Sequence, residues 1–195
     1  MKHSFEIRYD NLLLRDISKN DLCLMRKWRN DRDNSIFLRK INFITRENQE
    51  LWFDNYLCDE SEIGFTIVET RDLKRAIGSV FLYNLNFLNK ECEFGKFLIG
   101  DKNAHGKGLG SKATAMILEF GFKILKLQRI YASVNQKNMS AKNIYMKIGF
   151  QIIGSHEFHQ YLDGYEDEIE IFPSILEKNI DYIRDILIIE KNYCN

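Results

Sequence analysis

A glycine-rich turn between a strand and a helix constrains this chain more than any other feature of its sequence. Residues 99–110 read Ile-Gly-Asp-Lys-Asn-Ala-His-Gly-Lys-Gly-Leu-Gly, and apolar residues at helical spacing follow at once. Gly106, Gly108 and Gly110 have no Cβ atom, so an anion can reach main-chain N–H groups at the positive end of the helix dipole. The turn therefore predicts a site for a phosphorylated cofactor, although a plain strand-to-helix connection has the same pattern.

Two familiar phosphate-binding loops do not fit this turn. A Walker loop needs Gly-Lys followed by Ser or Thr, whereas residues 110–112 read Gly-Ser-Lys. A dinucleotide-binding turn belongs to the first strand of a βαβ unit, whereas this turn lies past the middle of the chain. The sequence therefore indicates another class of phosphate site.

The rest of the sequence alternates between short strands and helices. Apolar alternation and turn residues predict strands at 12–15, 62–69, 77–83, 91–100, 129–134, 150–153 and 168–172. Helical spacing and capping residues predict helices at 21–30, 45–57, 108–125 and 140–147, and a terminal helix from 174. This order predicts an α/β (α+β) domain with a mostly antiparallel sheet and one parallel crossover.

Composition and charge limit the classes of function. The 195 residues include 28 Lys and Arg and 28 Asp and Glu, so no strong basic field points to nucleic acid or a membrane surface. No Cys-x-x-Cys pair occurs, and no apolar run approaches the roughly 18 residues of a membrane-spanning helix, so a cytoplasmic protein with reduced thiols is expected. His156 and His159 lack a third ligand nearby, so no metal is expected.

A second motif follows the glycine turn after an intervening helix and strand. Its residues are Asn138, Ala141, Tyr145, Lys147 and the pair Gly149-Phe150. Together with the turn, it resembles the GNAT superfamily of acetyl-CoA-dependent N-acetyltransferases, and the resemblance covers residues 11–173. His105 departs from that family's turn, which usually has Arg or Gln at this position. The resemblance implies that main-chain N–H groups make most of the pyrophosphate contacts, so we expect binding to survive this change.

The resemblance implies a GNAT fold and a division of the chain. The expected fold is a mixed, mostly antiparallel sheet of about seven strands, flanked by helices and splayed between its fourth and fifth strands, at 91–100 and 129–134. The acetyltransferase domain is expected to occupy residues 1–173. Residues 174–195 are expected to form a C-terminal helical extension, which covers a sheet edge or contacts a second copy in a homodimer.

The resemblance also implies acetyl-CoA as the cosubstrate and suggests its contacts. Main-chain groups of Phe97, Leu98 and Ile99 are expected to pair with the pantetheine arm inside the splay. Asn138 is expected to hydrogen-bond the pantetheine or adenosine portion. The pyrophosphate is expected to lie on main-chain N–H groups of the turn and on the first helical serine, which involves His105, Gly106, Lys107, Gly108, Leu109, Gly110 and Ser111.

The expected chemistry needs a base for the ammonium proton, a donor for the oxyanion and an acid for the leaving thiolate. The resemblance assigns the acid to Tyr145 and the oxyanion donor to a main-chain N–H near Leu98 or Ile99. Glu93 is the preferred base because it lies nearer the splay than Glu91, which shares its face of the strand. The alternatives are a packing role for Tyr145, ion pairs for both glutamates, and a water chain as the base.

The front half is expected to recognise the acceptor. Residues 28–30 read Trp-Arg-Asn, and residues 44–53 read Ile-Thr-Arg-Glu-Asn-Gln-Glu-Leu-Trp-Phe. Both segments resemble the GNAT branch that acetylates 4-amino sugars on nucleotides during the synthesis of surface-glycan precursors. This implies a sugar-nucleotide acceptor bound by Arg29, Gln49 and Trp28. Core packing of the tryptophans and a solvated Arg29 are the alternatives.

Other acceptors and other functions also fit the sequence. Residues 83–86, 93–95, 120–122 and 164–167 resemble the spermidine and ribosomal-protein N-acetyltransferase branches, so a polyamine or a protein N-terminus is a second candidate acceptor. A non-catalytic module that binds acyl-CoA and a partner is a further alternative. The presence of Asn138 and Tyr145 argues against it.

Overall fold

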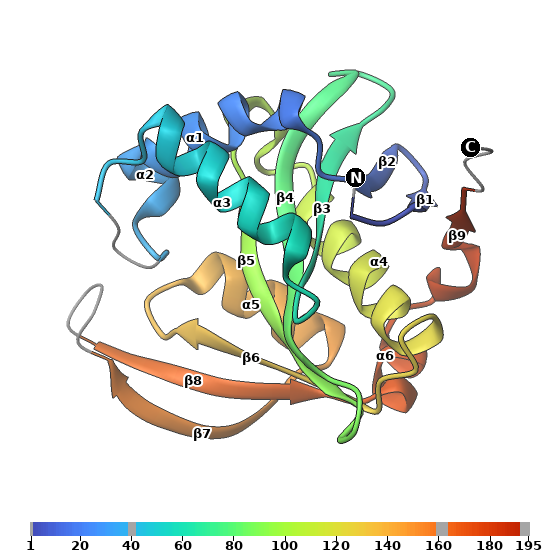
Figure 1. The fold of residues 1–195 in the computed structure, drawn as a ribbon. Helices are drawn as coiled ribbons and strands as arrows, with labels where there is room; N and C mark the ends of the chain where they lie inside the picture. Colours follow the sequence, from blue (N-terminus) through green and yellow to red (C-terminus); the bar gives the residue numbers. More distant parts are fainter. Residues whose placement is uncertain (1, 39–41, 159–163, 192–195) are drawn as a thin grey trace.

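The computed structural model describes residues 2–38, 42–158 and 164–191, which form a nine-stranded sheet with helices on both faces (Figure 1). The strands lie side by side in the order β7-β8-β6-β5-β4-β3-β2-β1-β9. Neighbouring strands are antiparallel except for the parallel pair β5 and β6. The strand bounds are β1 Phe5–Tyr9, β2 Leu12–Asp16, β3 Ile63–Glu69, β4 Arg75–Asn86, β5 Glu91–Ile99, β6 Arg129–Asn135, β7 Gln151–Phe158, β8 Gly164–Ile171 and β9 Leu187–Glu190.

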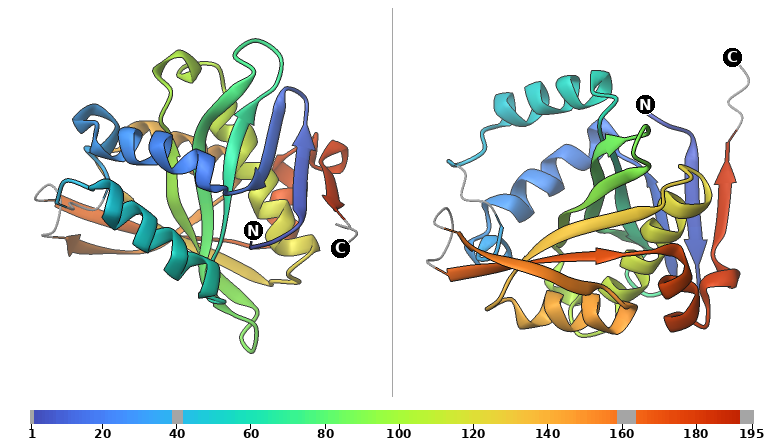
Figure 2. Two further views of the ribbon diagram at one scale, coloured as in Figure 1. Left: turned by 45° about the horizontal axis from the view of Figure 1, so that its top comes forward. Right: turned by 90° about the horizontal axis from the view of Figure 1, so that it is seen from below.

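The helices form two groups, one on each face of the sheet (Figure 2). Their bounds are α1 Leu22–Asn30, α2 Arg32–Ser35, α3 Arg46–Cys58, α4 Leu109–Lys123, α5 Met139–Ile148 and α6 Pro173–Asn179. Successive strand residues point to opposite faces, so the two faces have separate cores. On one face Phe81 of β4 packs with Phe53 of α3, and on the other its neighbour Leu82 belongs to the same core as Met116 of α4.

The parallel contact between β5 and β6 is short. It joins residues 91–93 to residues 129–131 and then stops. Beyond this point β5 remains paired with β4, and β6 remains paired with β8. The expected splay between these two strands is therefore confirmed.

The main chain of β5 becomes irregular just beyond this contact. Two β5 residues, Lys96 and Phe97, lie opposite the single β4 residue Val80, and Lys96 adopts a left-handed φ of 45°. Such a bulge removes main-chain groups from regular pairing and changes the direction of the side chains. The irregularity lies at the splay, in the segment where pantetheine contacts were expected.

The strand count differs from the expected seven because β1 and β9 extend one end of the sheet. β9 pairs with β1, with Ile188 opposite Ile7. The segment from residue 174 is therefore only partly helical, because α6 ends at Asn179 and the apolar residues near 188 belong to a strand. The spacing of these apolar residues also suits a helix. They form a strand because the edge of β1 offers unpaired main-chain groups.

Candidate functional site

The glycine turn forms the N-terminus of α4. Gly108 is the N-cap residue with a φ of 71°, and Gly106 has a φ of 74°, a left-handed conformation that favours glycine. A Cβ atom built on either glycine would meet no heavy atom within 4 Å, so the main chain of the turn faces open space. The N–H groups in the first turn of a helix have no acceptor within the helix. The turn therefore fits a phosphate group.

Gly110 allows three elements of the site to meet. A Cβ atom on it would lie 3.3 Å from Ile144 of α5 and 3.5 Å from Phe97 of β5. A larger residue would press on both side chains. The start of α4 thus lies against the bulged segment of β5 and against the helix that carries the second motif.

The remaining side chains of the turn have contacts of their own. Nε2 of His105 lies 2.8 Å from the carbonyl oxygen of Ile99, so the imidazole folds back onto the end of β5. Lys107 is exposed. Ser111 lies near the hydroxyl of Tyr182, which precedes β9. The open main chain at Gly106 and Gly108 and the exposed Lys107 are therefore the accessible parts of the turn.

The two principal residues of the second motif lie at different depths on α5. Asn138 is the N-cap residue, and its Oδ1 accepts a hydrogen bond from the main-chain N–H of Ala141 at 3.2 Å. Tyr145 is only 7% exposed, and its ring meets Phe94 edge-on with 5.5 Å between centroids. Burial raises the pKa of the Tyr145 hydroxyl, so the group stays protonated and can donate.

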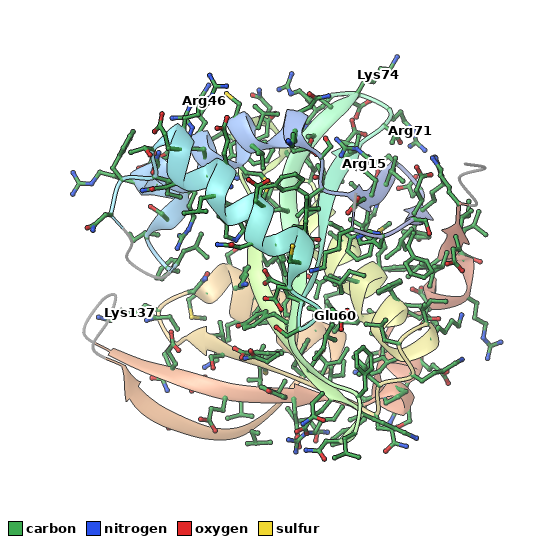
Figure 3. All side chains as sticks on the ribbon, in the orientation of Figure 1. Arg15, Arg46, Glu60, Arg71, Lys74 and Lys137 are labelled. Atoms are coloured by element: carbon green, nitrogen blue, oxygen red, sulfur yellow. The ribbon has the colours of Figure 1, made fainter. Side chains whose placement is uncertain are left out.

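A cleft of about 1120 Å³ brings together five of the residues expected from the sequence, namely Trp28, Arg29, Gln49, Glu93 and Leu98. It lies between the α1–α3 segment and strands β4 and β5, with contributions from β6 and β8. Figure 3 shows these elements with their side chains, and its labels mark Arg46 at the start of α3 and Lys137 in the turn between β6 and α5. Further polar and aromatic lining residues include Trp52, Phe81, Tyr83, Asn84, Ser133 and Glu166.

The cleft and the glycine turn lie on opposite sides of the splay. Tyr145 belongs to the core on the α4–α6 face, whereas Glu93 lines the cleft on the α1–α3 face. Phe94 connects the two sides, because it lines the cleft and its ring contacts Tyr145. The structure does not place Tyr145 or Asn138 among the residues that line the cleft.

The two candidate bases have different surroundings. Glu93 accepts hydrogen bonds from the Tyr83 hydroxyl and from the side-chain amide of Asn84, the latter at 3.0 Å. Glu91 instead forms an ion pair with Arg129, with 2.9 Å between Oε2 and Nη2. Only Glu93 of the two lines the cleft, which supports the preference for Glu93.

The tryptophans in the first half of the chain pack against other residues and also line the cleft. Trp28 is 7% exposed, and a Cβ atom on Gly100 would lie only 2.1 Å from its Cγ, so the indole packs on the end of β5. Trp52 stacks on Tyr56 with 5.4 Å between centroids. Gln49 is also buried. The packing role considered for the tryptophans is therefore real, and both rings still form part of the cleft wall.

The sequence did not point to Lys96, Ser133 or Glu166 as lining residues. Lys96 forms an ion pair with Glu62, and its Nζ lies 5.0 Å from the centroid of the Tyr83 ring. Its place in the cleft depends on the bulge, for which Gly95 is the only local signal in the sequence. Ser133 lies on β6 and Glu166 on β8, and the sequence alone does not show that these strands lie beside the cleft.

Neither a metal centre nor a membrane helix is found in the described part of the chain. Within residues 2–38, 42–158 and 164–191, no group of three or more His, Cys, Asp and Glu side chains is arranged to hold a metal ion. His159 lies outside these residues. Across the same ranges, no helix is both long and apolar enough to cross a membrane.

Comparisons with known proteins identify related chains. A family model described as acetyltransferase (GNAT) domain matches residues 11–151. Spermidine N(1)-acetyltransferase of Escherichia coli strain K12 is 35% identical over 108 residues, which span 54% of this chain and 55% of that protein. The match thus covers about half the length of that relative. Acetyltransferase PseH of Campylobacter jejuni is 26% identical over 159 residues, or 82% of this chain and 95% of that protein.

The same fold occurs in a solved structure of an acetyltransferase. Spermidine N-acetyltransferase from Vibrio cholerae, in complex with CoA and spermine, aligns with a TM-score of 0.78. The alignment covers 86% of this chain and 98% of that chain at 24% sequence identity. The shared sheet and helices establish the fold class for the present chain.

Proposed function

Because the chain belongs to the GNAT acetyltransferase family, we propose that it transfers an acetyl group from acetyl-CoA to a primary amine by direct attack. The position of the splay carries the proposal. It lies between a cleft lined by Glu93 on one face and the glycine turn and Tyr145 on the other. An amine in the cleft can therefore meet a thioester held from the opposite side.

The residues around the splay fit acetyl-CoA. The open main chain at Gly106 and Gly108 suits the pyrophosphate, because no side chain of the protein occupies that space. The edge of β5 from Phe97 to Ile99 that faces the splay has no partner strand within the ranges that the structure describes and suits the amide groups of a pantetheine arm, which would compete with His105 for the Ile99 carbonyl. His105, Lys107, Leu109, Gly110 and Ser111 complete the proposed pyrophosphate site, and Asn138 adds a polar group at the start of α5.

We assign three groups to the transfer itself. Glu93 accepts the proton of the bound ammonium, and the neutral amine attacks the thioester carbonyl. Main-chain N–H groups near Leu98 and Ile99 stabilise the oxyanion. The tetrahedral species then collapses to the amide as its C–S bond breaks, and Tyr145 donates its proton to the departing thiolate. The second proton lost by the nitrogen restores the Tyr145 hydroxyl.

For the acceptor, we propose the 4-amino group of a nucleotide-linked sugar. Arg29 lines the cleft and can form bidentate hydrogen bonds with a diphosphate. Lys96 supplies a second positive charge, and Trp28 and Trp52 offer aromatic surfaces for a sugar or a base. The similarity to PseH over most of its length supports this choice.

A polyamine acceptor is the second candidate. The carboxylates of Glu93 and Glu166 both line the cleft, and two similar proteins are spermidine acetyltransferases. A polyamine would be recognised by these two negative charges and would gain nothing from Arg29. The Arg29→Ala substitution therefore separates the two acceptors.

Release of the CoA thiol tests the proposal directly. The full chain is supplied with acetyl-CoA and, in turn, a 4-amino-sugar nucleotide, spermidine or a peptide with a free N-terminus. We expect turnover of the sugar nucleotide, loss of that turnover in Arg29→Ala, and retention in Arg26→Ala. Arg26 is a suitable control because it lies on the same helix but does not line the cleft.

Each other result of this assay contradicts a stated part of the proposal. Turnover of spermidine or of the peptide alone refutes the sugar acceptor and keeps the acetyl transfer. Binding of acetyl-CoA without turnover of any amine refutes the catalytic assignment and favours a binding module. Homodimerisation is a separate proposal, and light scattering of the pure protein tests it.

A further inference from the structure

We propose that Tyr83 and Asn84 are positioning residues that hold the Glu93 carboxylate toward the cleft. The inference rests on the proposed role of Glu93 as the base. Tyr83 lies directly opposite Glu93 in the antiparallel pair of β4 and β5, and all three residues line the cleft. A base whose oxygens are fixed before the substrate arrives transfers a proton without first reorganising.

Both oxygens of the Glu93 carboxylate have a donor from β4. The Tyr83 hydroxyl donates to Oε1, and Nδ2 of Asn84 donates to Oε2 at 3.0 Å. An ionised carboxylate offers about four lone-pair positions, so two donors leave room for the proton of an amine. The two hydrogen bonds fix the rotation of the carboxylate and leave its accepting capacity intact.

Two local features of the main chain make this arrangement possible. A Cβ atom on Gly95 would lie 3.0 Å from both Cε1 and the hydroxyl oxygen of Tyr83, so glycine leaves the space that this phenol needs. Asn84 has a left-handed φ of 51°, a conformation that Asn tolerates better than most residues. Asn84 lies in a bulge, because Asn84 and Leu85 together lie opposite the single β5 residue Cys92. The bulge and the glycine together accompany the contact with Glu93.

Lys96 holds the Tyr83 ring through a contact with the face of the ring. Its Nζ lies 5.0 Å from the centroid of that ring while it forms an ion pair with Glu62. A cation over the ring face leaves the hydroxyl at the ring edge free to reach Glu93. The ring is therefore held independently of the hydroxyl, and Tyr83→Phe keeps the ring contact while it removes the hydrogen bond to Glu93.

A double-substitution experiment tests the inference in the full chain. Turnover of a 4-amino-sugar nucleotide, or of spermidine if the sugar is not used, is measured for Tyr83→Phe, Asn84→Gly, Glu93→Gln and Tyr83→Phe combined with Glu93→Gln. Asn84→Gly retains the left-handed main chain while it removes the amide. Tyr131→Phe is the control, because Tyr131 is the β6 neighbour of Glu93 and no hydrogen bond joins the two among the described residues.

We expect Tyr83→Phe and Asn84→Gly each to lower kcat about 10-fold, the order of one charge-assisted hydrogen bond, with the Kd of acetyl-CoA unchanged. Tyr131→Phe should leave kcat unchanged. Tyr83→Phe should have no further effect in Glu93→Gln, because a residue that acts through the carboxylate has nothing left to position.

The alternative outcomes separate this inference from the proposed function. If Glu93→Gln lowers kcat but Tyr83→Phe does not, the positioning role is refuted and the base remains. A full 10-fold effect of Tyr83→Phe in the Glu93→Gln background also refutes it, since Tyr83 then acts elsewhere. An unchanged kcat in Glu93→Gln, or no turnover of either acceptor by the unmodified protein, refutes the base assignment and with it this inference.

Discussion

Substitution of Gly108 separates the conformational role of the glycine turn from its proposed role in binding acetyl-CoA. Gly108 has a φ of 71°, and a Cβ atom on it meets nothing within 4 Å. In the free protein, the substitution therefore carries only the cost of the left-handed conformation. With acetyl-CoA bound, the same carbon would occupy space that a phosphate needs. Stability and affinity should respond differently to the choice of side chain.

The magnitudes follow from that geometry. Alanine in the left-handed region costs about 1–2 kcal/mol, whereas asparagine tolerates it at lower cost. For a chain of this length each kcal/mol lowers Tm by roughly 2–4 °C, so Gly108→Ala should lose about 2–8 °C and Gly108→Asn less. Loss of one charge-assisted hydrogen bond to a phosphate weakens binding by roughly 10- to 100-fold. Both variants should show this loss, because both add the same Cβ atom.

Thermal unfolding without ligand and calorimetric titration with acetyl-CoA measure the two effects. We expect Gly108→Asn to keep nearly normal Tm and still to lose acetyl-CoA affinity. Gly108→Val should fold less stably and bind least. Normal affinity in Gly108→Asn would refute the reasoning, because it would show that the turn is only a connection between β5 and α4.

Three further substitutions test other parts of the structure. Tyr145→Phe should lower kcat and leave the Kd of acetyl-CoA unchanged; an equal kcat would exclude the acid role. Gly100→Ala should cost about 1–3 kcal/mol of unfolding free energy and raise the acceptor KM, since its Cβ would lie 2.1 Å from Trp28. The pKa of Glu69 is lowered to about 2, against the burial that opposes it, by hydrogen bonds from main-chain N–H groups of residues 71–73 and from Asn11. The ionised Glu69 therefore stabilises the fold above its ordinary pKa of 4.5, and this stabilisation is lost as the pH falls toward 2. Glu69→Gln should lower the free energy of unfolding by about 2 kcal/mol at pH 7 and weaken its dependence on pH between those values. An unchanged pH dependence of unfolding would exclude this role.

Local sequence signals predicted the elements around the glycine turn well. The turn, α4 and α5 follow from glycine positions and helical spacing, which are properties of short segments, whereas the cap at Asn138 is seen only in the structure. The splay also agrees with expectation, although it came from the family resemblance and not from the pattern of residues. β9 shows the limit of periodicity, since its apolar residues also suit a helix and only the edge of β1 selects a strand.

Some residues that line the cleft were predicted from the sequence, but their contacts with one another were not. Arg29 and Gln49 were expected on the acceptor side, and both line the cleft. Tyr83 and Asn84 appeared only as part of a shared motif, because their contact with Glu93 depends on strand register and on the left-handed turn at Asn84. Register is a property of paired strands, so no single segment of sequence encodes it.

The short parallel contact also has a consequence for hydrogen exchange. Three residues of β5 join the β6–β8–β7 part of the sheet to the rest, so beyond Glu93 one edge of β5 has no neighbouring strand. Amides along such an edge exchange with solvent faster than those inside a sheet. A ligand that pairs with this edge would act as the missing strand and slow their exchange. Deuterium uptake by residues 94–99 would then report occupancy of the splay without any acceptor being present.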